Sequence, residues 1–480
     1  MTNSLKTQFL SGVAWTSISR FGSLGIQFLV TIILARLLNP EDFGVIALLT
    51  VFIAIAQILL DSGFGDALIQ RESNSTLEYS SVFYLNILIG IVCYLILFIG
   101  SPLLDSFYNI KSLHIYARIL FLVIPINALG LIQRVQLRQS LSFKKLSIIE
   151  IVAAIISGIV GISLAFLGFG IYSLIGQLLT INIFRTLLTI LINRWCPTLE
   201  FSIDALRPLF RFGINLTLSG LLTVFFNNIH TILIGKYYCP KSVGYYNQAK
   251  QYEQLSSNTI TDIVLNVSYP TLVKLKDESN RLREVYKKII EAVVFLVVPL
   301  MCILFIISDD LLVLLLSEKW LPASIFFKIL CLYGITFPLH QINGNILKVK
   351  GKSKTYLNIE LIRRVLLIIS IVVTLHISIE AMLYGQIIAM SVIILISMYY
   401  SGRLIDYKLF NQIKDIIPYY IAGIIASVIS VYFYQFLSFI PVIKIIVMSL
   451  IYVAFYITLC KILVADALNT VLTLLKSRKL

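Results

Sequence analysis

The sequence predicts an all-α, polytopic membrane protein with about fourteen transmembrane helices. Of its 480 residues, 58% are hydrophobic and only 13% are charged, and the mean hydropathy is +0.92. A soluble globular protein of this composition would lack the polar side chains that cover a surface in water. Apolar runs of about 20 residues, the length of a helix that crosses the hydrocarbon core, recur along the chain.

These apolar runs predict membrane-spanning helices in fourteen places. The eighth run is the least hydrophobic, so a total of twelve or thirteen helices stays open. The first run has no small-residue cleavage site after it and is expected to be retained. The predicted spans are 12–35, 43–64, 80–100, 115–135, 148–168, 170–192, 209–235, 244–268, 288–308, 322–346, 357–376, 379–400, 415–436 and 441–464.

The basic residues support this arrangement. A net charge of +15 would suggest a nucleic-acid partner in a soluble protein, but here the charges sit in short loops, and no nucleic acid is expected. With the N-terminus in the cytoplasm, the predicted inner segments hold 25 of the 39 Lys and Arg residues and the outer loops hold six. This asymmetry follows the positive-inside rule and predicts that both termini are cytoplasmic.

Metal and catalytic signatures are weak. The six cysteines form no C-x-x-C pair, and the four histidines have no metal-ligand spacing, so no metal site is expected. A membrane glycosyltransferase or polymerase would need paired carboxylates. Asp309-Asp310 is interpreted instead as a solvated pair in a short connection. The chain is therefore expected not to be an enzyme and to have no catalytic residues.

An internal repeat predicts two related halves. Residues 35–44 and 235–244 share the pattern small–basic–x–x–x–Pro–x–x–apolar–Gly, and Leu137-Arg138, Lys144 and Glu150 recur 210 residues later as Leu347-Lys348, Lys354 and Glu360. Since each half has an even number of spans, the halves are expected to be parallel repeats that meet at a central cleft. The predicted divisions are an N-lobe (1–200, helices 1–6), a C-lobe (201–405, helices 7–12) and a segment with helices 13 and 14 and a basic tail (406–480).

Polar side chains recur at steps of three and four in helices 1, 7 and 8. Charges and amides tolerate apolar burial worst, so these stripes favour a hydrated cavity. For the Ser and Thr members, hydrogen bonding in a dry bundle is an equal alternative. The predicted cavity residues are Arg20, Gln27, Asn227, His230, Lys250, Gln254 and Asn258, and the candidate ion-coupling residues are Asp61, His230 and Asp262.

The cleft candidates carry more positive than negative charge, which suits an anionic, lipid-linked substrate. Arg118, Arg363 and Arg364 are expected near helix ends, where long side chains reach to the interface. A small-molecule multidrug exporter for cations is one alternative, but it would need acidic residues deep in the cleft. A membrane scaffold without transport is another, which the charged stripes disfavour.

Two motifs also carry a family resemblance. Residues Leu34–Gly44 and Asp61–Arg71 resemble bacterial polysaccharide transporters, in particular lipopolysaccharide-biosynthesis flippases of the colanic-acid type within the multidrug/oligosaccharidyl-lipid/polysaccharide exporter superfamily. Residues 143–146, 234–236 and 244–270 agree as well, so the resemblance extends to about residue 400.

The resemblance implies a flippase that moves undecaprenyl-pyrophosphate-linked oligosaccharide units across the bacterial inner membrane for lipopolysaccharide or exopolysaccharide synthesis. It further implies a polysaccharide polymerase and glycosyltransferases as partners, no cofactor, and coupling to a proton or sodium gradient. Many relatives have an aspartate where this chain has Asn228-Ile229-His230, so His230 could replace an acidic coupling residue.

Overall fold

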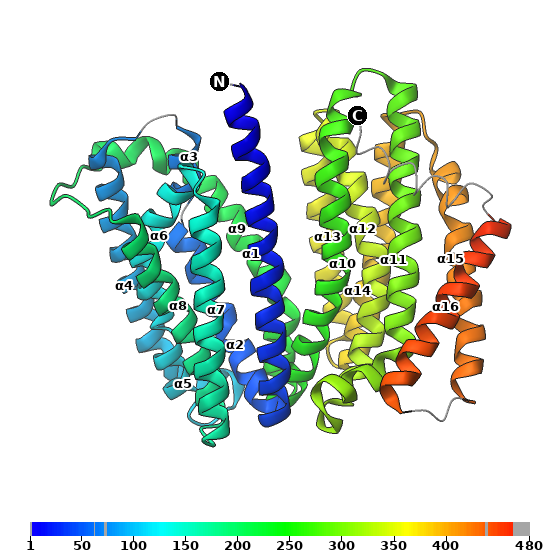
Figure 1. Cartoon of the computed structure of the whole chain (residues 1–480), viewed down its shortest axis with the longest axis horizontal. Helices are drawn as coiled ribbons and strands as arrows, with labels where there is room; N and C mark the ends of the chain where they lie inside the picture. The colour runs from blue at the N-terminus through cyan, green and yellow to red at the C-terminus, as the bar shows by residue number, and fades with distance from the viewer. Residues whose placement is uncertain (1, 62, 72–73, 437–439, 464–480) are drawn as a thin grey trace. The chain divides into compact units, whose positions relative to one another are not determined.

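The computed structural model describes residues 2–61, 63–71, 74–436 and 440–463. These parts are helical throughout, with no strand among them, which confirms the all-α prediction (Figure 1). Their helices are α1 (Thr2–Leu37), α2 (Pro40–Asp61), α3 (Phe64–Gln70), α4 (Thr76–Tyr108), α5 (Leu113–Leu120), α6 (Val123–Gln139), α7 (Phe143–Phe166), α8 (Ile171–Asn193), α9 (Ile203–Tyr237), α10 (Pro240–Lys274), α11 (Ser279–Leu316), the 3-10 turn η1 (Glu318–Trp320), α12 (Ala323–Val349), α13 (Ser353–Thr374), α14 (Ile379–Arg403), α15 (Leu409–Tyr434) and α16 (Pro441–Leu463).

The predicted spans coincide with the long helices. Within the described residues, eleven helical segments are long and apolar enough to cross a membrane, and Phe21–Leu37 in α1 is a shorter apolar helix. The remaining two predicted spans, the eighth and the eleventh, correspond to α10 and α13, which are rich in polar and charged residues. The chain is thus a multi-pass membrane protein.

The fourth predicted span is broken into α5 and α6. Pro125 lies in the first turn of α6. Because proline has no N–H, Pro125 cannot donate a hydrogen bond to the carbonyl of Phe121, four residues earlier. The chain instead makes a tighter turn in which Ile124 N donates to Phe121 O at 2.9 Å. The interruption is therefore written into the sequence.

The chain divides into two compact units, Met1–Gly244 and Tyr245–Leu480. In the first unit α4 packs on α6, α6 on α8 and α7 on α8. In the second unit α11 packs on α12, α12 on α14 and α13 on α14. The helices α12 and α13 begin 210 residues after α5 and α7. This shared packing order supports two related helical bundles, as the repeat predicts.

The helix α9 belongs to the first unit by its contacts, although it opens the second half of the repeat. It packs on α2, α3 and α4. Close approach is provided by small residues, as is usual between membrane helices: a Cβ on Gly63 would lie 2.6 Å from Gly213 Cα, and a Cβ on Gly235 would lie 2.3 Å from a methyl carbon of Leu48. The lobe boundaries at 200 and 405, which describe the duplication, stay a prediction.

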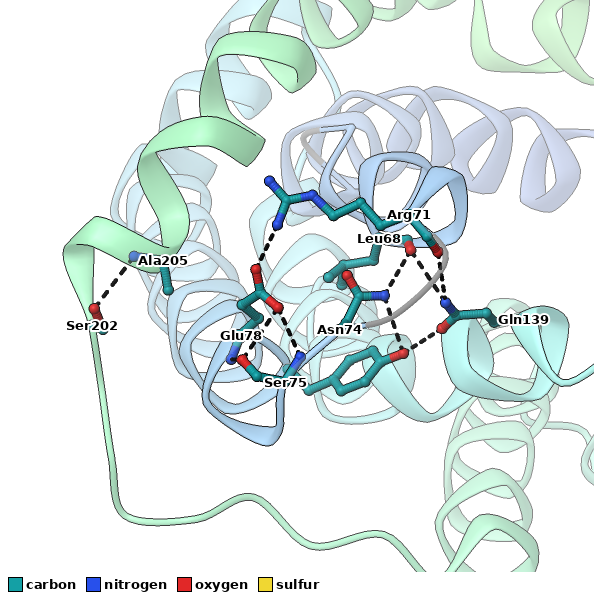
Figure 2. Close-up of polar contacts among 9 residues, drawn as sticks. Leu68, Arg71, Asn74, Ser75, Glu78, Gln139, Ser202 and Ala205 are labelled. Carbon is teal, nitrogen blue, oxygen red and sulfur yellow. Dashed lines mark hydrogen bonds and ion pairs between the residues drawn. The ribbon is translucent and has the colours of Figure 1, made fainter.

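A polar corner joins α3, α4 and α6 (Figure 2). Ser75 caps α4 by accepting a hydrogen bond from Glu78 N at 3.2 Å, and Ser75 N donates to the Glu78 carboxylate at 2.8 Å. Glu78 also accepts from Arg71 at 2.5 Å. Gln139 of α6 donates to Arg71 O at 3.2 Å. This capping box satisfies the free N–H groups at the start of α4 and fixes its entry angle.

The last two helices pack against the second unit. A Cβ on Gly423 in α15 would lie 2.6 Å from Val298 of α11. Tyr456 of α16 is buried and donates to Phe295 O at 3.3 Å. Predicted helices 13 and 14 are therefore docked on α11 through small and aromatic residues.

Candidate functional site

The predicted cavity residues lie on α1, α9 and α10. Gln27 and Lys250 are half-buried, Asn227 and Gln254 are exposed, and His230 is buried. The side chains of Arg20, Asn258 and Asp262 lie outside the part of the chain that is described. Since α1 and α9 belong to the first unit and most of α10 to the second, a cavity shared by the three stripes stays a prediction.

The hydroxyl members of the α9 stripe bond to their own helix. Thr223 Oγ1 donates to Ser219 O at 2.8 Å, and Thr217 Oγ1 donates to Gly213 O at 3.0 Å. Ser and Thr satisfy themselves in this way without water, so these hydroxyls do not require a hydrated cavity. Asn227, an exposed amide on the same stripe, is the stronger indicator of water.

Lys250 has an acidic neighbour that the sequence interpretation missed. Glu253 lies one turn further along α10, is buried, and interacts electrostatically with Lys250. Its carboxylate accepts a hydrogen bond from Ser257 at 2.7 Å. A Cβ on Gly334 of α12 would lie 2.6 Å from Glu253 Oε1. The spacing of three between Lys250 and Glu253 was the available signal.

Asp61, a candidate for ion coupling, ends α2. A Cβ on Gly65 would lie 2.8 Å from its Oδ1 atom. Arg134 and Arg138 attract its charge and Asp66 repels it. Asp61 is thus part of the α2–α3 turn, and this packing alone does not distinguish a structural role from ion coupling.

The first unit contains a buried arginine cluster. Glu150 of α7 accepts two hydrogen bonds from Arg185 of α8, from Nη2 at 2.7 Å and from Nε at 3.0 Å. Arg134 of α6 interacts electrostatically with both residues. The guanidinium of Arg134 donates to the carbonyls of Gly130 and Asn127, each at 3.4 Å. Two arginines therefore share one carboxylate.

The second unit contains a related cluster that includes a histidine. Glu360 of α13 accepts from Arg363 at 2.8 Å and lies 2.8 Å from His340 Nε2 of α12. The prediction that Arg363 lies near a helix end and reaches to the interface is wrong. Arg363 sits midway along α13 (Ser353–Thr374), where pairing with Glu360 offsets the cost of placing a charge in the bilayer.

Metal-ligating side chains do not gather in either unit. Over the described ranges, no group of three or more His, Cys, Asp or Glu residues is arranged to hold a metal ion. The polar clusters are instead arranged as hydrogen-bonded charge pairs between neighbouring helices. Such arrangements suit charge recognition and proton binding.

Two helical bundles with related packing and with polar and charged side chains inside them define a polytopic membrane transporter. Residues 33–325 match the model of the polysaccharide biosynthesis protein family, and the chain belongs to this family. The resemblance predicted from the two sequence motifs is confirmed. The alternative of a glycosyltransferase or polymerase is set aside, because the family consists of transporters rather than enzymes.

Curated relatives carry names from the same area. The chain is 30% identical over 352 residues to the teichuronic acid biosynthesis protein TuaB of Bacillus subtilis (strain 168), covering 73% of each chain. It is 26% identical over 353 residues to the lipopolysaccharide biosynthesis protein WzxC of Escherichia coli (strain K12), covering 73% of this chain and 71% of the relative.

The fold is shared with a solved transporter. The structure of the lipid II flippase MurJ, in an inward closed conformation, superposes with a TM-score of 0.70 over 94% of this chain and 99% of that chain, at 16% sequence identity. At this identity the likeness establishes the fold alone.

Proposed function

We propose that this chain is a flippase that translocates undecaprenyl-pyrophosphate-linked oligosaccharide repeat units across the bacterial inner membrane. The observation that carries the proposal is the family match over residues 33–325, which extends across both compact units. The relatives named for teichuronic acid and lipopolysaccharide biosynthesis support it. The fold shared with a lipid II flippase is consistent with it.

The proposed substrate is an anion with a sugar head and a lipid tail. Arg20 and Lys250 would hold the pyrophosphate, because guanidinium and ammonium groups donate charge-assisted hydrogen bonds to phosphate oxygens. The amides of Asn227, Gln254 and Asn258 would bind sugar hydroxyls, with Gln27 and His230 beside them. Glu253 holds an opposite charge near Lys250, and this pairing would keep the ammonium ready until phosphate replaces the carboxylate as its partner.

The proposed mechanism is alternating access. Parallel repeats in transporters rock against one another around a central site, and the lipid tail would stay in the bilayer. The excess of basic residues in alternate loops supports cytoplasmic termini. A proton or sodium gradient is the proposed energy source, with Asp61, His230 and Asp262 as candidate sites. A polysaccharide polymerase and glycosyltransferases would supply and consume the substrate.

The test uses a strain from which the gene is deleted, complemented with R20A or K250A. We expect loss of surface polysaccharide at unchanged protein level, whereas K288A, an exposed lysine in a charged connection, should complement fully. Normal export by both variants would show that the phosphate assignment is wrong. If deletion leaves the polysaccharide intact and sensitises cells to cationic drugs, the multidrug exporter is the correct alternative.

A further inference from the structure

Glu150 and Glu360 occupy equivalent positions in the two halves. They are 210 residues apart, and the helices that carry them, α7 and α13, begin 210 residues apart as well. The exposed fraction of the side chain is 32% for Glu150 and 16% for Glu360. A carboxylate within a membrane bundle needs a cationic partner. The nature of that partner differs between the two units.

In the first unit both partners of the glutamate carry a permanent charge. Arg185 forms a salt bridge with Glu150 at 2.7 Å, and Arg134 on the preceding helix α6 interacts with it electrostatically. Arginine keeps its proton at every physiological pH. With Glu150 ionised, the charge of this cluster is therefore constant at +1.

In the second unit one permanent and one titratable partner surround the glutamate. Arg363 binds one carboxylate oxygen of Glu360, with Nε at 3.0 Å and Nη2 at 2.8 Å. His340 binds the other oxygen through Nε2 at 2.8 Å. His340 lies on α12, whose counterpart in the first unit, α6, supplies Arg134. A histidine thus takes the place of an arginine as the partner from this helix.

The surroundings of His340 accommodate both protonation states without moving a heavy atom. An ionised carboxylate only accepts hydrogen bonds, so Nε2 must donate to Glu360. The other nitrogen, Nδ1, lies 3.1 Å from Ser397 Oγ on α14. The serine hydroxyl can donate to Nδ1 in the neutral ring, or accept from the Nδ1 proton of the charged ring. The ring is buried, with 4% of its residue surface exposed.

Other charged and titratable groups lie close to this cluster. They act on it from four helices, and they include both signs of charge. Among the described residues these groups are Glu360, Arg363, Arg364 and Tyr356 of α13, Tyr333 of α12, Tyr286 of α11 through its bond to Asn343, and Glu253 of α10 through Tyr333, while α14 contributes the hydroxyl of Ser397.

We propose that His340 is a proton-binding site of the second unit and that proton binding there drives the transport cycle. With neutral His340, the charges of Glu360 and Arg363 cancel. Addition of a proton at Nδ1 raises the cluster to +1, the constant value of the first unit. A buried net charge changes the cost of exposing or closing the cluster, so the two protonation states favour different conformations. The coupling to transport rests on the proposed function, whereas the proton site itself does not.

The proton site is tested by ¹⁵N NMR of the full chain in lipid nanodiscs with labelled histidine. The chain has four histidines, so each signal can be assigned by single replacement. We expect one ring to titrate between about pH 5 and 8, the range in which histidine changes charge. This signal should disappear in H340Q and move to lower pH in E360Q. It should be unchanged in E150Q, the matched variant in the first unit.

A His340 signal that keeps one protonation state across this range would overturn the proposal. If H340Q does not fold, the signal that E360Q shifts and E150Q leaves in place serves as the assignment. The absence of any such signal also overturns the proposal.

The coupling is tested in proteoliposomes with a fluorescent undecaprenyl-pyrophosphate-linked disaccharide and an imposed pH gradient. We expect the gradient to accelerate flipping by wild type and by E150Q, and H340Q to lose this acceleration. Flipping by wild type that ignores the gradient refutes the coupling. If wild type does not move the probe at all, the proposed function fails for this substrate class, and the NMR result still decides the proton site.

Discussion

Gly44 and Gly244 pack reciprocally against each other's helix starts. A Cβ on Gly44 would lie 1.8 Å from Pro240 O, and a Cβ on Gly244 would lie 1.9 Å from Pro40 O. Each glycine ends one copy of the Pro-x-x-x-Gly segment, in the first turn of α2 or α10. Contacts in which each residue meets the equivalent of its own neighbour are typical of two-fold symmetry. The two motif copies therefore cross as a pseudo-symmetric pair.

This crossing predicts that G44A and G244A each destabilise the protein. The overlapping atoms are backbone carbonyl oxygens, which cannot rotate away, so the helix starts must separate. We expect a loss of at least about 2 kcal/mol, within the range for overpacked sites, measured by thermal unfolding in nanodiscs.

The matched control for the glycine variants is G100A. Gly100 lies inside α4, and nothing lies within 4 Å of its Cβ position. Alanine there should stabilise the helix by about 0.5–1 kcal/mol. Equal unfolding temperatures for G44A and G100A would refute the close crossing.

The predicted hydration of the α9 stripe can be tested by cysteine labelling. Asn227 and Phe225 are both exposed on α9, but only Asn227 belongs to the polar stripe. In a background without native cysteines, we expect N227C to react with a membrane-impermeant thiosulfonate roughly tenfold faster than F225C, because water permits formation of the reactive thiolate. Similar slow rates at both positions would place the stripe against lipid.

The ion pair between Glu150 and Arg185 should show an asymmetry. E150Q leaves Arg134 and Arg185 without their shared carboxylate, whereas R185Q leaves Glu150 with Arg134. We therefore expect E150Q to be the more destabilising change. A double-mutant cycle should give a coupling of about 1 kcal/mol, since the pair is partly exposed.

The control for this cycle is the pair Arg281–Glu278, which is 68% and 58% exposed. Its coupling should lie at the low end for surface pairs, near zero. A larger coupling at this exposed pair than at Glu150–Arg185 would contradict the assignment of a buried cluster in the first unit.

The capping box of α4 predicts a smaller effect. S75A removes the acceptor for Glu78 N and should cost about 1 kcal/mol, the usual value for an N-cap serine. S106A, which removes an exposed hydroxyl bonded to Leu103 O in the same helix, should stay within about 0.5 kcal/mol of wild type. Thermal unfolding of both variants tests whether the corner in Figure 2 stabilises the fold.

Local patterns predicted much of what the structure contains. The apolar runs located the long helices because the bilayer sets their length. The motif ending at Gly44 and Gly244 revealed the repeat, since both copies meet the same steric demand for a residue without a side chain. The spacing of Ser75 and Glu78 is likewise a local signature of a helix start.

The partners of the charged residues could not be predicted in this way. Glu253 was missed beside Lys250, and Arg363 was expected at the interface although it binds Glu360. His340 and Glu360 are 20 residues apart on different helices, and no periodicity links them. Their meeting depends on how far each helix is rotated about its axis.

The sequence by itself determined the membrane class, the helix positions, the duplication and the family, because hydropathy and motif spacing act along the chain. The tertiary structure alone decided that α9 packs on α2 and that Glu150 meets arginines whereas Glu360 meets a histidine. The physical reason is that an ion pair is specified by distance in space, which depends on packing between helices that are remote in sequence.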